Sequence, residues 1–139
     1  MPVMKKFLLV AALFSMFLSC NSDDSDDIPV TLVGQWRLVA VYSDPGDGSG
    51  SFRDVDSQKR VTFAADSTIS SNGSLCNISL DANDPTSGTY DSSDQSISIP
   101  DCFQDAEFNP ITTYEIVNNR LIISYLCIEG CQEKYKKAN

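Results

Sequence analysis

The sequence contains no histidine and few basic residues: 10 Lys and Arg stand against 19 Asp and Glu, for a formal net charge of -9. Because histidine is the commonest general base and metal ligand, its absence excludes histidine-based triads and the familiar zinc hydrolase sites. The acidic balance disfavours a nucleic-acid partner, since nucleic-acid binders need a positive surface. No apolar run reaches the roughly 20 residues of a bilayer span. What remains is one acidic domain, because 139 residues lie near the usual domain size.

Residues 1–20 differ in composition from the rest of the chain. Lys5 and Lys6 precede a nearly continuous apolar run over residues 7–18, which leads into Leu18-Ser19-Cys20. A positive start followed by a short apolar core is typical of a secretory signal peptide. The ending resembles a bacterial lipobox, in which the cysteine is lipidated. We therefore expect a signal peptide over residues 1–19 and a lipid anchor, such as palmitate, on Cys20.

Residues 20–29 are expected to form a flexible tether. Residues 21–27 contain four aspartates and no apolar residue, so they cannot bury enough surface to offset their ordering entropy. An acidic segment directly after a lipidated cysteine also resembles the export signal of Bacteroidota surface lipoproteins. This resemblance implies a lipid anchor in the outer membrane with the domain exposed at the cell surface. The alternative is a domain that faces the periplasm.

From residue 30 onward the pattern is typical of β-strands. Trp36, Leu38 and Ala40 alternate with more polar residues over 34–42, as expected for a strand with one buried face. Further β-prone runs follow between turn-forming clusters, over residues 60–64, 68–71, 75–80, 88–91, 96–100, 112–117, 120–128 and 131–136. Short strands at this spacing predict an all-β fold, an antiparallel up-and-down β-barrel of about eight strands or a sandwich. No convincing helical periodicity follows Cys20.

Four cysteines remain after Cys20, and in an exported protein an even number favours disulfides. Three pairings are open to Cys76, Cys102, Cys127 and Cys131. The closeness of Cys127 and Cys131 across an expected turn favours this pair, which leaves Cys76 with Cys102. Because no Cys-x-x-Cys spacing occurs, we expect no zinc site, and we assign no metal or cofactor.

The start and end of this region resemble lipocalins. Gly34-Gln35-Trp36 is similar to the Gly-x-Trp strand that opens these proteins, and the Cys127 to Cys131 ending is similar to that of lipocalin-like lipoproteins of Bacteroidota. The likeness covers roughly residues 30–137, and we assign residues 30–139 to a lipocalin-like barrel domain. It implies that Trp36 closes the barrel base and that a basic side chain of the last strand packs on its ring. Lys134 or Lys136 would take that place, and we assign Lys134 with Gly34 and Trp36.

The resemblance implies a protein that binds a small hydrophobic or amphipathic ligand inside the barrel. The residues assigned to its wall are Leu38, Phe63, Ile97, Tyr114, Ile116, Ile123 and Tyr125. Side chains can equally fill such a barrel, and the short strands and large interior residues favour a filled core. The alternative function is then a non-catalytic, surface-displayed structural or protein-interaction module.

Two acidic features have plain explanations. Residues 44–51 alternate oxygen-bearing side chains as a calcium loop does, but they lack the downstream bidentate glutamate, which favours a solvated turn. Glu129 and Glu133 have the spacing of a carboxylate pair, yet such pairs arise by chance among 19 acidic residues. We therefore expect no enzymatic activity.

Overall fold

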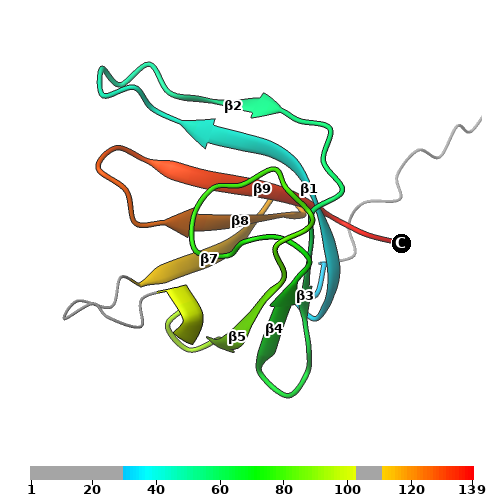
Figure 1. Ribbon diagram of the computed structural model, residues 1–139. Coiled ribbons are helices and arrows are strands. Elements are labelled where there is room, and N and C mark those ends of the chain that lie inside the picture. The colour runs from blue at the N-terminus through cyan, green and yellow to red at the C-terminus, as the bar shows by residue number, and fades with distance from the viewer. Residues whose placement is uncertain (1–29, 103–110) are drawn as a thin grey trace, which may run out of the picture.

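The computed structural model describes residues 30–102 and 111–139. Its elements are β1 (Gly34–Ser43), β2 (Ser51–Asp54), β3 (Arg60–Phe63), β4 (Thr68–Ser71), β5 (Thr86–Asp91), β6 (Ser96–Ser98), the 3-10 turn η2 (Pro100–Cys102), β7 (Thr112–Val117), β8 (Arg120–Tyr125) and β9 (Cys131–Lys137). The strands form one antiparallel sheet that closes where β9 pairs with β1 (Figure 1). The predicted all-β antiparallel barrel is confirmed.

Nine strands make an eight-stranded barrel because β2 and β3 share one edge of β1. The first half of β1 pairs with β3 and its second half pairs with β2. Residues 55–59 interrupt this edge, but two backbone hydrogen bonds hold them to β1: Val55 N–H to Val39 O at 2.9 Å and Leu38 N–H to Lys59 O at 3.0 Å. Since β9 occupies the other edge of β1, the sheet has eight positions around the barrel.

Alternation along the strands sets what lies inside. In β1 the side chains of Trp36 and Leu38 are fully buried and their neighbours on either side are more exposed, which is the expected period of two. The same rule buries Leu121 and Ile123 of β8 and Tyr135 of β9. Within the described residues, the strands surround one hydrophobic core, and two disulfides crosslink the chain.

Two expectations about the strands were wrong. Residues 75–80 form no strand, because their N–H groups bond to side chains instead of a neighbouring strand: Leu75 N–H donates to Thr86 Oγ1 and Cys76 N–H to Ser74 Oγ. The short strand β2, which follows a glycine-rich turn, was not predicted. Over residues 30–102 and 111–139, η2 is the one helical element, and no helix there is long and apolar enough to cross a bilayer.

The predictions for residues 1–29 lie outside the described residues. They comprise the signal peptide, the lipidated Cys20 and the acidic tether.

Candidate functional site

One end of the barrel is closed by Trp36, which is fully buried. Its indole Nε1–H donates to the carbonyl of Leu32 at 2.8 Å. The Lys137 ammonium lies 4.5 Å from the centre of the Trp36 ring system, and it donates to the carbonyls of Thr31 and Val33 at 2.6 Å each. The segment before β1 is thereby fixed across the barrel base. Burial lowers the pKa of Lys137 below its usual value.

The basic residue on Trp36 is Lys137, so the assignment of Lys134 was wrong. The register of β9 places Lys137 opposite Trp36, whereas the Lys134 ammonium lies 3.6 Å from the centre of the Phe52 ring. Because side chains alternate along a strand, two residues three positions apart point to opposite faces. Gly34 has a φ of 127°, and a Cβ there would lie 2.9 Å from Lys137 Nζ. A side chain at this position would collide with the ammonium.

The side chains expected to line a ligand cavity pack against one another in the core. Six of them are buried: Leu38, Phe63, Ile97, Tyr114, Ile123 and Tyr125. The Phe63 ring contacts the rings of Tyr90 and Tyr114 at centroid distances of 5.0 and 5.3 Å. Ile116 is 36% exposed, so its assignment to the interior wall was wrong. Its strand, β7, continues there past the pairing with β6, which ends at Thr113.

A polar cluster of four buried side chains occupies the interior toward the other end: Lys59, Tyr125, Glu133 and Tyr135. Lys59 Nζ lies 2.8 and 2.9 Å from the two carboxylate oxygens of Glu133, and neither side chain has exposed surface. The hydroxyls of Tyr125 and Tyr135 both donate to Glu133 Oε2, the first at 2.6 Å. The N–H of Ser79 donates to Oε1 at 2.9 Å.

Burial dominates the electrostatics of this polar cluster. It raises the pKa of both Tyr125 and Tyr135 well above 10.0, and the nearby charge of Glu133 adds to the effect. Burial lowers the pKa of Lys59, while attraction to Glu133 acts in the opposite direction. A carboxylate offers about four lone-pair sites, and the protein's own donors occupy those of Glu133. The cluster is thus built to hold the interior together and presents no open position for a substrate.

Sequence reasoning missed Lys59 and treated Glu133 only as part of a chance pair. Residues 56–60 have the composition of a solvated loop, and the partner of Lys59 lies 74 positions further along the chain. A signal for Glu133 was present in β9, because alternation places it on the same face as Tyr135. A carboxylate on the inward face needs a buried partner.

Residues 72–85, here called the plug, connect β4 to β5 and run across the barrel in front of β8 in Figure 1. The plug contacts the polar cluster through the Ser79 N–H, which donates to Glu133. Leu75 of the plug is 1% exposed. The carbonyl of Leu80 accepts a hydrogen bond from Ser57 Oγ at 2.7 Å. At Gly73, a Cβ would lie 2.2 Å from the carbonyl oxygen of Asp81, so the plug folds tightly on itself. A ligand entering from this end would have to displace the plug.

Both expected disulfides are confirmed. Cys76 of the plug is bonded to Cys102 at the end of η2, and Cys127 is bonded to Cys131 across the turn from β8 to β9. The first bond ties the plug to the segment after β6. The second constrains a hairpin tip on which Ile128 is fully exposed.

The acidic turn after β1 is organised by its own backbone. Asp44 Oδ1 accepts the N–H groups of Gly46 and Gly48 at 2.8 and 3.2 Å, and Asp44 Oδ2 accepts that of Gly50 at 3.3 Å. These bonds lower the pKa of Asp44. In the described part of the chain no group of three or more acidic or cysteine side chains could hold a metal ion.

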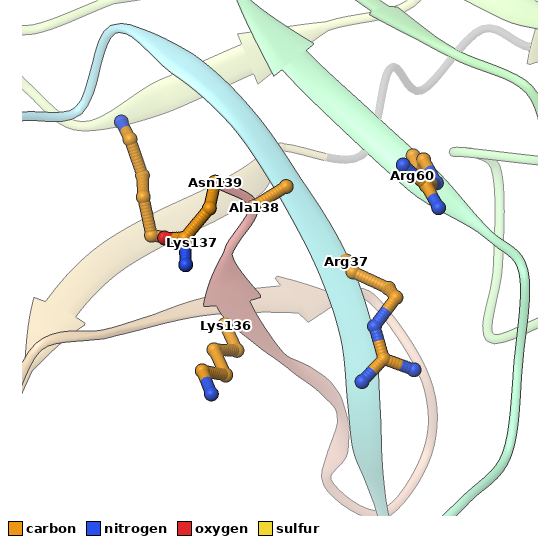
Figure 2. Close-up of a pocket in the computed structure, with 6 residues that line it drawn as sticks. All are labelled: Arg37, Arg60, Lys136, Lys137, Ala138 and Asn139. Carbon is orange, nitrogen blue, oxygen red and sulfur yellow. The ribbon is translucent and has the colours of Figure 1, made fainter.

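The outer surface carries a basic pocket of about 250 Å³. Its lining residues come from β1, β3, β9 and the residues that follow β9 (Figure 2): Arg37, Arg60, Lys136, Lys137, Ala138 and Asn139. It is notable as a concentration of positive charge on a protein of net charge -9.

The lipocalin-like domain family matches residues 32–139. The chain belongs to the lipocalin-like family. The match begins just before β1 and ends after β9, so it spans the whole barrel. No curated protein matches the chain. Lipocalins are typically non-enzymatic binding proteins, and the family suggests small hydrophobic ligands. In this lipocalin-like barrel, the interior that would receive such a ligand holds the packed aromatic core and the polar cluster.

Proposed function

We propose that this protein is a lipid-anchored, non-catalytic lipocalin-like module of the outer membrane that acts through its outer surface. Cys20 would carry the lipid, and the acidic segment after it would tether the barrel to the bilayer. The lipobox resemblance and the signal-like residues 1–19 support the anchor. Several acyl chains on one cysteine would make the attachment stable.

The observation that carries a surface function is the occupied interior. The polar cluster and the plug fill the end of the barrel opposite Trp36. Glu133 of the cluster pairs with Lys59 and also accepts a hydrogen bond from the Ser79 N–H of the plug. Opening this end would break the hydrogen bond from the Ser79 N–H to Glu133 and expose the buried side chain of Leu75, and both losses oppose it. The family's usual binding position is therefore closed by side chains of the protein itself.

Metabolic labelling with an alkyne analogue of palmitate tests the anchor. The full chain expressed in a Gram-negative host should carry the label in the outer-membrane fraction, and Cys20→Ala should not. An unlabelled wild-type chain would overturn the anchor. Protease treatment of whole cells then separates the two orientations, because a surface-exposed barrel is accessible without breaking the cell.

A second candidate function is transport or storage of a small hydrophobic ligand, which the family membership favours. It requires that the plug move out of the barrel. Thermal unfolding with fatty acids or sterols, compared with an equal concentration of detergent, distinguishes the two functions. The surface module should show the same small change in Tm with both. A rise in Tm specific to one lipid would establish the carrier instead.

A further inference from the structure

We infer that the face formed by β3, β1, β9 and β8 docks onto a phosphate-bearing lipid surface through a row of four cationic side chains. This inference specifies the outer surface that the proposed function requires. The residues of this basic row are Arg60, Arg37, Lys136 and Arg120.

The basic row follows from strand register. Arg37 of β1 is paired with Arg60 of β3 on one side and with Lys136 of β9 on the other. Lys136 is paired in turn with Arg120 of β8. Four neighbouring strands thus present a cation at the same level of the barrel. In β1, β8 and β9 a residue adjacent to the cation in the strand is buried inside, namely Leu38, Leu121 and Tyr135, so these cations lie on the outer face.

The cations of the basic row are not neutralised within the described part of the chain. Arg60 donates to the amide oxygen of Gln35 at 3.1 Å, and Arg120 donates to the carbonyl of Asn119 at 3.2 Å, both neutral acceptors. In the ranges 30–102 and 111–139 the ion pair found is Lys59 with Glu133, on the inside. On the next strand, β7, the residue paired with Arg120 is Val117, so no acidic residue stands at this end of the row.

Like charges directly opposite each other destabilise a sheet, so the basic row is a cost that an external anion would remove. Three members, Arg37, Arg60 and Lys136, line the pocket in Figure 2, where phosphate oxygens could approach all three strands. The net negative charge of the molecule does not prevent this contact. Beyond about 10 Å, charges are largely screened at 0.1 M salt, so nearby cations dominate.

The position of the chain's N-terminal part favours a lipid surface over an acidic protein. Val33 and Thr31, which precede β1, are bonded to Lys137, the neighbour of Lys136. Ten residues separate this region from Cys20, and they span at most about 35 Å. A lipid on Cys20 would therefore keep the basic row within reach of headgroup phosphates.

Vesicle binding of the unlipidated chain from Asn21 to Asn139 tests the docking surface independently of the anchor. The vesicles contain phosphatidylcholine alone or with about 30 mol% phosphatidylglycerol, and binding is measured by co-sedimentation at low and moderate salt. The test variant is Arg37→Gln/Lys136→Gln. The matched control is Arg53→Gln/Lys134→Gln, which removes the same charge from outside the basic row. Circular dichroism confirms that each variant is folded.

The wild-type chain should bind only the anionic vesicles and should dissociate as salt rises. Each cation near such a surface strengthens partitioning about fivefold, so the test variant should bind about thirtyfold more weakly. The control should stay within about threefold of wild type. Equal loss in both variants, equal binding to neutral vesicles, or no binding to anionic ones would overturn the proposal. Competition by millimolar inorganic phosphate would also overturn it, because it would indicate a site for a small free anion.

Discussion

At the scale of single residues, the most costly feature of this protein is the charge inside the barrel. Lys59 and Glu133 have no exposed surface, so both lose their hydration on folding. Their attraction offsets this loss only because the donors of Tyr125, Tyr135 and Ser79 complete the hydrogen bonding. A buried pair of this kind favours one arrangement of the interior more than it adds net stability.

Glu133→Gln should lower the free energy of unfolding by about 3 to 5 kcal/mol, because it leaves the Lys59 ammonium buried without its counter-charge. The double variant Lys59→Met/Glu133→Gln removes both charges. It should therefore be less destabilised than the sum of the two single variants by about 1 to 3 kcal/mol. Urea unfolding of Glu133→Gln, Lys59→Met and the double variant measures this coupling, and strictly additive losses of stability would contradict it.

The buried phenols should make the fold sensitive to alkali. Because the pKa of Tyr125 and Tyr135 is raised in the folded state, their contribution is complete below about pH 10 and is lost as pH rises, since the unfolded chain ionises first. The lowered pKa of Lys59 acts with the opposite sign. The contribution of the tyrosines is therefore the difference between wild type and Tyr125→Phe/Tyr135→Phe in how the free energy of unfolding changes with pH. Urea unfolding below and above about pH 10 measures it. An identical alkaline decline in both proteins would refute it.

Lys137 and Lys134 form a matched pair for testing the barrel closure. Lys137→Met removes two short hydrogen bonds from a cation to backbone carbonyls and the contact with Trp36, so stability should fall by about 1.5 to 3 kcal/mol. Lys134→Met loses only a contact with the Phe52 ring and should cost less than about 1 kcal/mol. Thermal unfolding compares the two. A larger loss for Lys134→Met would mean that Lys137 does not close the base.

At the scale of the elements, the sequence predicted those strands whose pattern is decided locally. The alternation around Trp36 predicted β1 to within a residue of its observed end at Ser43. Residues 75–80 were misassigned because Ser74 and Ser79 accept hydrogen bonds from backbone N–H groups two residues further on, an alternative to strand pairing that composition does not reveal. The choice between Lys134 and Lys137 depended on the register of β9, and a change of one position reverses the face of every side chain. The pairing of Lys59 with Glu133 could not be predicted from the sequence, because only the closed barrel brings these two residues together.

The two disulfides should differ in what their removal costs. Cys76 and Cys102 are 26 positions apart, whereas Cys127 and Cys131 are 4 apart. Since loop-closure entropy grows with loop length, replacing the first pair by alanine should cost about 3.5 kcal/mol and the second about 2 kcal/mol. Urea unfolding of the two paired variants measures the difference. A greater loss from the shorter loop would show that the plug is held mainly by its other contacts.

At the scale of the whole molecule, charge is distributed unevenly. The chain is acidic overall, with a formal net charge of -9, yet four cations face one another across four neighbouring strands. Close to this face, the four cations should therefore outweigh the net negative charge of the molecule, because charges further away are screened.

This distribution predicts that the basic row lowers the protein's own stability. Arg37 has a like charge on both neighbouring strands, so Arg37→Gln should raise the free energy of unfolding by about 0.2 to 1 kcal/mol at low salt. Arg53→Gln changes the net charge equally but lies on β2, opposite Val41, and should not stabilise. The difference between the variants should shrink as salt screens the row. Thermal unfolding at low and high ionic strength measures it, and a destabilised Arg37→Gln at low salt would mean that repulsion along the row is already relieved within the protein.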